Sequence, residues 1–380
     1  MTDQRADIDY SAVKNLPELL DVLSRNGVPE DRLWDYVSAF QSIKAREAGI
    51  PLSGQFELTP LCNLDCKMCY VHLDQDLLKG ASPLQPEQWK DIIAQAHSMG
   101  MMYATLTGGE CLTYPGFEEV YLFLRSMGIR TSLITNGVLL DRKWMDLFSK
   151  HPPAGMTVSL YGSSGEAYQS VTGHDVFDAV YSHLLALKKA EFPVTVGITP
   201  SAYMLQDIPD LLKLVRQLDF SFVVNVALFQ PRKETGREIR DLTPEEYAWI
   251  FRQMRDPGAV AAIPGEEHLL PRLTSPKDSS GCIRCGAGRC FFSVDWHGRL
   301  SACNNLPSRR VSLLETPFSD AWQQIHSEIL SYPPAEECTK CEYDQKCFHC
   351  AAYRRSGAEA GHCNPKVCEK TRLYVKEGLL

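Results

Sequence analysis

Cysteines are the residues of this 380-residue chain with the clearest capacity for chemistry, because closely spaced thiolates bind metals. The chain has 14 of them. Cys62, Cys66 and Cys69 lie in one short segment, Cys111 stands alone, and the remaining ten follow residue 280. Three thiolates this close can hold three corners of an iron–sulfur cubane, and the fourth iron then stays open to another ligand. Residues 62–69 are therefore a predicted cluster-binding loop.

The composition indicates metal ligation rather than disulfides. The first ten residues are polar and acidic, without the apolar segment of a secretion signal. No stretch approaches the roughly 18 consecutive apolar residues that a transmembrane helix needs. We therefore expect a cytoplasmic protein with no membrane partner. In that reducing compartment, thiols serve as metal ligands far more often than as disulfides.

The charge balance argues against a nucleic-acid partner. The formal net charge is −8, and no basic patch is dense enough to neutralise several phosphates. We expect the two arginine pairs, Arg309-Arg310 and Arg354-Arg355, on solvated faces. With 44% hydrophobic residues, the chain can bury one large core and a smaller appended module.

Strands and helices alternate along the middle of the chain. Short apolar runs predict strands at residues 55–59, 102–107, 130–135, 156–160, 194–199 and 222–229, and amphipathic patterns between them predict helices at 86–99, 117–127, 177–190 and 208–218. Such alternation with right-handed connections predicts a parallel sheet covered by helices. The fold class is therefore α/β, with six units forming an open, TIM-like (β/α)6 barrel. Its chemistry is expected at the carboxyl ends of the strands.

The flanking segments differ from the barrel. Residues 16–26 and 30–48 are predicted helices that cap one end of it, with substrate docking as the alternative. A helix from residue 243 to about 254 precedes a Gly- and Pro-rich stretch, and a strand at 290–295 and a helix at 319–330 follow. We expect a helical extension (1–50), the barrel (51–255), a linker (256–281) and a cysteine-rich module (282–380) held together by metal rather than by a core.

The CxxxCxxC spacing of Cys62, Cys66 and Cys69, placed after the first strand, resembles the signature of the radical S-adenosylmethionine (SAM) superfamily. Thr107-Gly108-Gly109-Glu110 likewise resembles that family's GGE motif. The resemblance implies that the open iron of a 4Fe-4S cluster binds SAM and that SAM is cleaved to a 5′-deoxyadenosyl radical. The implied SAM-contacting residues are Met68, Gly108, Gly109, Glu110, Asn136 and Ser159. The plainer interpretations are a core methionine at Met68 and an Asn-Gly turn at Asn136.

The later cysteines resemble the SPASM domain, which binds two auxiliary 4Fe-4S clusters. One spacing departs from that pattern, since two residues rather than three separate Cys347 from Cys350. The resemblance implies Cys285, Cys290, Cys303 and Cys350 for the first auxiliary cluster, and Cys338, Cys341, Cys347 and Cys368 for the second. Cys111, Cys282 and Cys363 are left over, and Cys363 competes with Cys368 for the last position. Zinc bound by the CxxC pairs is the alternative.

SPASM enzymes mostly modify peptides. The resemblance therefore implies an oxidoreductase that matures a ribosomally made precursor peptide by a thioether or carbon–carbon crosslink, with a flavodoxin- or ferredoxin-like electron donor. A dehydrogenase, decarboxylase or epimerase of a small sugar or nucleoside is the alternative, because only about fifty residues precede the barrel. A non-catalytic iron–sulfur carrier would leave the glycine motif unexplained.

Formylglycine formation, the reaction of anaerobic sulfatase maturases, is disfavoured. Those enzymes carry an Asp base directly after the cysteine that corresponds to Cys303, whereas this chain has Asn304. An amide cannot accept the proton. The remaining acid–base candidates are Asp295, Tyr161 and His297.

Overall fold

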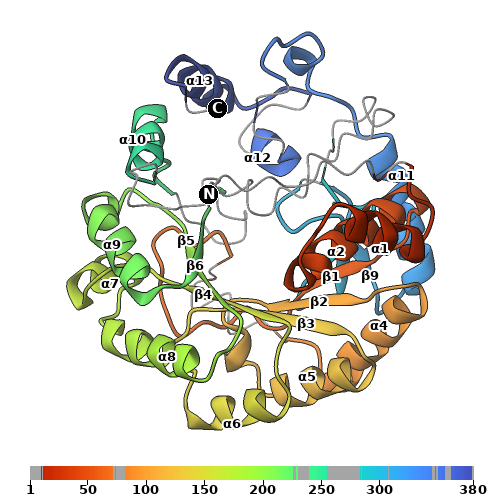
Figure 1. Ribbon diagram of the computed structural model, residues 1–380, viewed down its shortest axis with the longest axis horizontal. Coiled ribbons are helices and arrows are strands. Elements are labelled where there is room, and N and C mark those ends of the chain that lie inside the picture. The colour runs from red at the N-terminus through yellow and green to blue at the C-terminus, as the bar shows by residue number, and fades with distance from the viewer. Residues whose placement is uncertain are drawn as a thin grey trace.

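The structure is a computed structural model, and it describes residues 10, 12–71, 73, 82–225, 228–229, 239–254, 283, 285–306, 308–344, 347, 350–355 and 361–378. Cys282, the whole predicted linker (256–281) and part of the predicted strand at 222–229 lie outside these residues. The ribbon in Figure 1 follows the chain from the N-terminal helices through the sheet to the C-terminal helix.

Six parallel strands form the centre of the molecule, and they lie side by side in chain order. They are β1 (Ser53–Glu57), β2 (Tyr103–Thr107), β3 (Arg130–Thr135), β4 (Gly155–Ser159), β5 (Val194–Ile198) and β6 (Ser221–Val224). Each predicted strand is found within a few residues of its expected position. The order β6-β5-β4-β3-β2-β1 and the helices between the strands confirm the predicted α/β, open-barrel fold.

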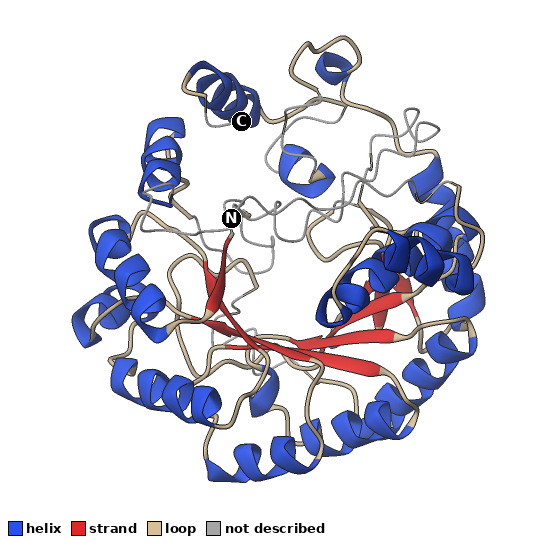
Figure 2. Ribbon diagram, viewed as in Figure 1, coloured by secondary structure: helices blue, strands red, loops and turns tan. Residues whose placement is uncertain are grey.

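Helices cover the outer side of the curved sheet (Figure 2). They are α4 (Pro86–Ser98), α5 (Phe117–Ser126), α6 (Arg142–Lys150), α7 (Gly165–Thr172), α8 (Phe177–Lys189) and α9 (Ile208–Leu218). Alternate strand residues pack outward against them. Phe56 of β1, for example, is fully buried, and its ring meets that of Trp89 in α4 at 6.0 Å. Neighbours such as Glu57 therefore face the inside of the barrel, because successive side chains of a strand point to opposite faces.

The cysteine-rich region extends the barrel sheet instead of standing apart from it. Strand β7 (Phe291–Val294) pairs parallel with β1, and β8 (Arg299–Ser301) and β9 (Val311–Ser312) follow antiparallel. The helix α11 (Phe318–Leu330) packs behind β7, where the rings of Phe292 and Phe318 lie 5.0 Å apart. We expected a module held by metal rather than by a core; at this end it shares the hydrophobic core of the barrel.

The N-terminal helices α1 (Leu16–Arg25) and α2 (Leu33–Ala48) lie at the opposite end of the strands from the predicted site. Trp34 of α2 stacks on the guanidinium of Arg130, the first residue of β3, at 4.2 Å. Gln41 accepts a hydrogen bond from the hydroxyl of Tyr103, the first residue of β2. These contacts are those of a packing cap over the amino ends of the strands.

The C-terminal helix α13 (Pro365–Lys376) packs against α10 (Pro244–Met254), the first described helix after the last barrel strand (Figure 1). The rings of Phe251 and Tyr374 meet at 4.8 Å between them. The short helix α12 (Ala351–Arg355) lies between the cysteines of this region. In the described part of the chain, no helix combines the length and the apolar character needed to cross a membrane.

Candidate metal centre

The predicted cluster-binding loop, residues 62–69, leaves the carboxyl end of β1 and is pinned against α7. The backbone N–H groups of Asp65 and Lys67 donate to the carbonyls of Thr172 and Val171, both at 2.9 Å. The N–H of Cys69 donates to the carbonyl of Cys66 at 3.1 Å. The loop is thus held by backbone hydrogen bonds, which place its three thiols independently of any metal.

Two glycines let the loop after β2 pack directly on the cysteine loop. A Cβ at Gly108, whose φ is +152°, would lie 2.5 Å from the carbonyl oxygen of Thr59, and one at Gly109 would lie 2.3 Å from that of Leu61. These contacts are with backbone atoms, which cannot move aside as a flexible side chain could. The structure therefore gives both glycines a packing reason, and their contact with SAM stays a prediction.

Glu110 is buried and ties β2 to β3. One carboxylate oxygen accepts from the N–H of Asn136 at 2.7 Å, and the other from the Thr135 hydroxyl at 2.9 Å and the Leu112 N–H at 3.1 Å. Burial raises the pKa of this carboxyl, and these donors oppose the rise. Glu110, one of the implied SAM-contacting residues, thus has protein donors, and it positions Asn136 through the backbone N–H of that residue.

Asn136 reaches from the end of β3 to the cysteine loop. Its amide nitrogen donates to the side-chain oxygen of Asn63 at 2.8 Å and to the sulfur of Cys62 at 3.7 Å. Its side-chain oxygen accepts from the N–H of Val138 at 3.0 Å, which closes the turn. Asn136 therefore forms the Asn-Gly turn and also contacts the cysteine loop.

Tyr161, which follows β4 in the sequence, provides a second side-chain donor to the thiols. The hydroxyl of Tyr161 hydrogen-bonds to Cys66, and this lowers the pKa of that thiol, while Ser159 hydrogen-bonds to Tyr161. Burial, followed by the charge of Cys66, raises the pKa of Tyr161 well above its ordinary value. Tyr161 therefore lies at the thiols as a donor, and its role as an acid–base group stays a prediction.

The electrostatics of the loop suit a metal cluster. Burial raises the pKa of Cys62 to about 12 and that of Cys66 well above its ordinary value, and the charges of the neighbouring thiols add to the rise. Thiolates that are buried together need a bound cation to stay ionised. Asn136 and Tyr161 add donors of the kind that surround cluster sulfurs. Met68 is buried beside these thiols, and Ser159 is half-buried at the end of β4.

In the C-terminal region, the thiols that raise one another's pKa form two groups. We call Cys285, Cys290, Cys303 and Cys350 the first thiol group. Burial raises the pKa of Cys350 to about 11, and the thiols that add to this are Cys285 and Cys303. Cys350 therefore lies with these residues despite its irregular spacing. Among the described residues, no three His, Cys, Asp or Glu side chains are arranged to hold a single metal ion.

The second thiol group lies around α12 and the start of α13. It consists of Cys338, Cys347, Cys363 and Cys368, which belong to one apolar cluster that Cys350 of the first group also contacts. The arginines of α12 lie beside this group and are buried, with Arg354 only 5% exposed and Arg355 9%. Arg355 donates to the carbonyls of His362 and Pro333. Our expectation of a solvated face for this pair was wrong, because the sequence does not show that both guanidiniums have buried acceptors.

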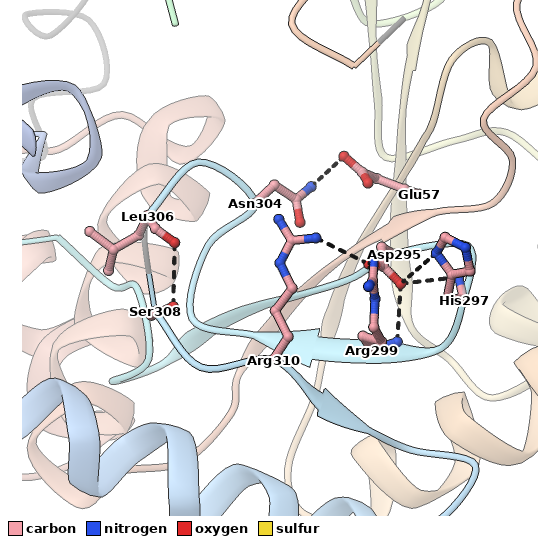
Figure 3. Close-up of polar contacts among 8 residues, drawn as sticks. All are labelled: Glu57, Asp295, His297, Arg299, Asn304, Leu306, Ser308 and Arg310. Atoms are coloured by element: carbon pink, nitrogen blue, oxygen red, sulfur yellow. Dashed lines mark hydrogen bonds and ion pairs between the residues drawn. The ribbon is translucent and has the colours of Figure 1, made fainter. Parts of the chain in front are cut away.

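Asp295, an acid–base candidate, is committed to the turn between β7 and β8 (Figure 3). Its buried carboxylate accepts from the backbone N–H groups of His297 and Arg299 at 3.0 and 3.1 Å. It also pairs with the guanidinium of Arg299 at 2.8 Å and with that of Arg310 at 3.5 Å. These contacts favour a structural role over proton transfer for Asp295, and with it for its neighbour His297.

Sequence reasoning missed Glu57. This buried glutamate ends β1, faces the barrel interior, and accepts a 2.7 Å hydrogen bond from the side-chain amide of Asn304 (Figure 3). Asn304 directly follows Cys303, so the pair links the first thiol group to the barrel wall. The signal in the sequence was a charged residue at the end of an otherwise buried strand.

Comparison with known proteins gives a family model that matches part of the chain, and relatives that cover most of it. Residues 56–215 match the model of the Radical SAM superfamily. The AdoMet-dependent heme synthase of Methanosarcina barkeri is 25% identical over 321 residues, which is 78% of this chain and 90% of the relative. The PqqA peptide cyclase of Rhodopseudomonas palustris is 25% identical over 342 residues, which is 83% of this chain and 86% of the relative.

Two solved structures share the fold over most of their length. SuiB of Streptococcus suis, bound to S-adenosylmethionine, superimposes with a TM-score of 0.65 at 16% identity and covers 92% of this chain and 86% of its own. The enzyme anSMEcpe, bound to AdoMet and the Cp18Cys peptide, gives a TM-score of 0.67 at 19% identity and covers 87% of this chain and 97% of its own.

Proposed function

Since residues 56–215 form a radical SAM domain, we propose that this chain cleaves SAM reductively and oxidatively modifies a ribosomally made precursor peptide. The bond formed would be a thioether or a carbon–carbon crosslink at an unactivated C–H position. One observation carries the proposal. Three thiols of one loop, two glycines that allow close backbone packing, and the donors Asn136 and Tyr161 converge at the carboxyl edge of the sheet.

Each residue has a defined task in this proposal. Cys62, Cys66 and Cys69 would hold a 4Fe-4S cluster that, with SAM bound, supplies a 5′-deoxyadenosyl radical. Asn136 and Tyr161 donate to two of these sulfurs and orient them. Glu110 in turn fixes Asn136 through its backbone N–H.

The barrel interior has the character of a binding surface. Thr105 and Thr107 of β2 and Thr157 and Ser159 of β4 are half-buried, whereas the residues between them are buried against the helices. Short polar side chains leave room and offer hydrogen bonds to backbone amides of a substrate. This is the surface on which we place the substrate, next to the SAM-binding edge.

Similar proteins support a peptide as the substrate. The PqqA peptide cyclase is named for a peptide, SuiB has been solved with the precursor peptide SuiA, and anSMEcpe with peptides. The AdoMet-dependent heme synthase, which is named for a small molecule, favours a second candidate, the modification of a small molecule. That candidate would use the same radical site with a different occupant of the barrel.

The C-terminal thiols would hold two auxiliary 4Fe-4S clusters, which accept the electron that remains after hydrogen abstraction. Burial raises the pKa of Cys290 to about 11, Arg46 of α2 opposes this rise, and Arg46 thus adds a positive charge to the first thiol group. A flavodoxin- or ferredoxin-like protein would be the electron donor for SAM cleavage.

The proposal is tested by expressing the chain anaerobically with short open reading frames encoded beside its gene. Mass spectrometry of the peptides should show the loss of two hydrogens per crosslink, dependent on SAM and on Cys62, Cys66 and Cys69. Unmodified peptides together with SAM-dependent dehydrogenation, decarboxylation or epimerisation of a small sugar or nucleoside would replace the leading proposal with the second candidate.

A further inference from the structure

The chain has one thiol too many for the second auxiliary cluster. Cys338, Cys341, Cys347, Cys363 and Cys368 all lie in this part of the sequence, and a cubane takes about four thiolates. The family resemblance selects Cys341 and leaves Cys363 aside. The positions of the side chains make a different selection.

Cys363 lies at the centre of the second thiol group. Only 4% of its surface is exposed, and its sulfur is 4.0 Å from that of Cys368. Asn364 fixes this arrangement, because its side chain caps α13 by accepting from the N–H of Lys366 at 3.0 Å. Cys363 thus directly precedes the helix and Cys368 lies one turn inside it, with both sulfurs at the same end.

The packing in this region includes Cys363 and leaves Cys341 out. Cys347 and Cys363 are buried in one apolar cluster, and Cys338 and Cys368 pack against it, together with Cys350 of the first thiol group. Among the described residues, Cys341 is not part of this cluster, and it is half-exposed. Its backbone N–H donates to the Cys338 carbonyl at 3.4 Å, so it belongs to the turn that follows Cys338.

A buried positive charge is directed at the same thiols. The side chain of Arg354 is 6% exposed and pairs with Asp344 at 3.2 Å. Its peptide carbonyl accepts from the N–H of Asn364, the residue after Cys363, at 2.7 Å, so Arg354 lies beside these thiols. A guanidinium is buried only where negative charge compensates its desolvation. Asp344 provides part of that charge, and thiolates of the second thiol group would add to it.

From these contacts we infer that Cys363 is a ligand of the second auxiliary cluster, together with Cys338, Cys347 and Cys368, and that Cys341 is dispensable for cluster binding. The inference rests on the proposed function only in that the C-terminal region binds two clusters. Arg354, paired with Asp344, is the buried positive charge beside this site.

The test compares single variants of matched chemistry. Cys363→Ser, Cys341→Ser and Cys368→Ser are reconstituted anaerobically beside the wild type, and iron and sulfide are counted per chain. The wild type should hold about twelve irons at four per cubane. Cys363→Ser and Cys368→Ser should lose about four of them together with one EPR signal of the reduced protein, and Cys341→Ser should lose none. Circular dichroism confirms that each variant is folded.

The iron counts distinguish a failure of this ligand assignment from a failure of the proposed function. Loss of a cluster in Cys341→Ser, with full iron in Cys363→Ser, would overturn the inference and restore the ligand set that the family pattern implies. A Cys363–Cys368 disulfide in the iron-loaded wild type, detected by mass under non-reducing conditions, would also overturn it. About four irons in the wild type itself would contradict the auxiliary clusters of the proposed function, since a single cubane would account for all of them. A variant that fails to fold is replaced by its Cys→Ala counterpart, for which the same iron counts are expected.

Discussion

The side-chain amide of Asn304 donates a 2.7 Å hydrogen bond to the carboxylate of Glu57, and both residues are buried. The pair connects the residue after Cys303 with the end of β1, the strand that leads into the cysteine loop. An amide is the partner that suits a buried carboxylate here, because it supplies a donor without adding negative charge. The residue after Cys303 therefore serves as a hydrogen-bond donor to Glu57.

Replacing Asn304 by Asp should make stability depend on pH. Two buried carboxylates in contact cannot both ionise, so one of them acquires a raised pKa. The folded state then binds the extra proton, and stability falls as the pH rises above the ordinary carboxyl range. We expect Asn304→Asp to melt lower than the wild type at pH 8 and to recover in part at pH 5.5. Thermal melts at both pH values measure this.

Asn304→Ala is the control for that experiment. It leaves Glu57 without this donor and should cost about 1–3 kcal/mol, with no added pH dependence. Equal pH profiles for the Asp and Ala variants would show that Glu57 and residue 304 do not interact in solution.

Gly109→Ala should displace the cysteine loop. Its Cβ would lie 2.3 Å from the carbonyl oxygen of Leu61, so the two loops must separate, at a cost of about 1–3 kcal/mol. We expect the variant to lose the iron bound by Cys62, Cys66 and Cys69 while it keeps the rest. The control is Gly128→Ala, where φ is +75° and no atom lies within 4 Å. This control introduces strain at a positive φ but no clash with another loop, so it should retain all its iron.

Tyr161→Phe should lower the reduction potential of the cluster on the cysteine loop. Donors to cluster sulfurs favour the more negative, reduced state, and the Tyr161 hydroxyl donates to Cys66. Tyr168→Phe is the matched control, because the hydroxyl of Tyr168 is buried and has no hydrogen-bond partner among the described residues. An EPR-monitored redox titration that gives one potential for both variants would refute this role.

Asp295→Asn should affect stability and leave SAM cleavage intact. The change removes the charge that Arg299 and Arg310 pair with, and we expect a loss of about 1–3 kcal/mol. Release of 5′-deoxyadenosine per reduced cluster should match that of the wild type. A variant of wild-type stability that no longer modifies substrate would instead restore Asp295 as an acid–base group.

Much of the fold could be predicted because the pattern is local. Each barrel strand is a short apolar run between turn residues, and all six were found. The helices α6 and α7 were missed because they are short, and their signals are single caps: Asp141 accepts from the Trp144 N–H, and Ser164 from the Ala167 N–H. A short capped segment does not stand out from a loop in sequence alone.

The part of the site whose residues lie close together in the sequence could be predicted. Contacts between residues that are far apart in the sequence could not. The thiols of residues 62–69 are visible as a motif. The Glu57–Asn304 contact joins residues 247 positions apart, so neither reveals the other in the sequence. The burial of Arg354 depends on its ion pair with Asp344, ten positions away, so the sequence alone favours a solvated face for a charged pair at the end of a short helix.

The most direct test of the radical SAM assignment is the release of 5′-deoxyadenosine from SAM by anaerobically reconstituted, reduced protein, with iron counted in the same sample. The wild type should release the nucleoside and hold about twelve irons. The triple variant with Cys62, Cys66 and Cys69 changed to Ala should release none and hold about eight. Nucleoside release that survives in the triple variant, or zinc in place of iron in the wild type, would contradict the account.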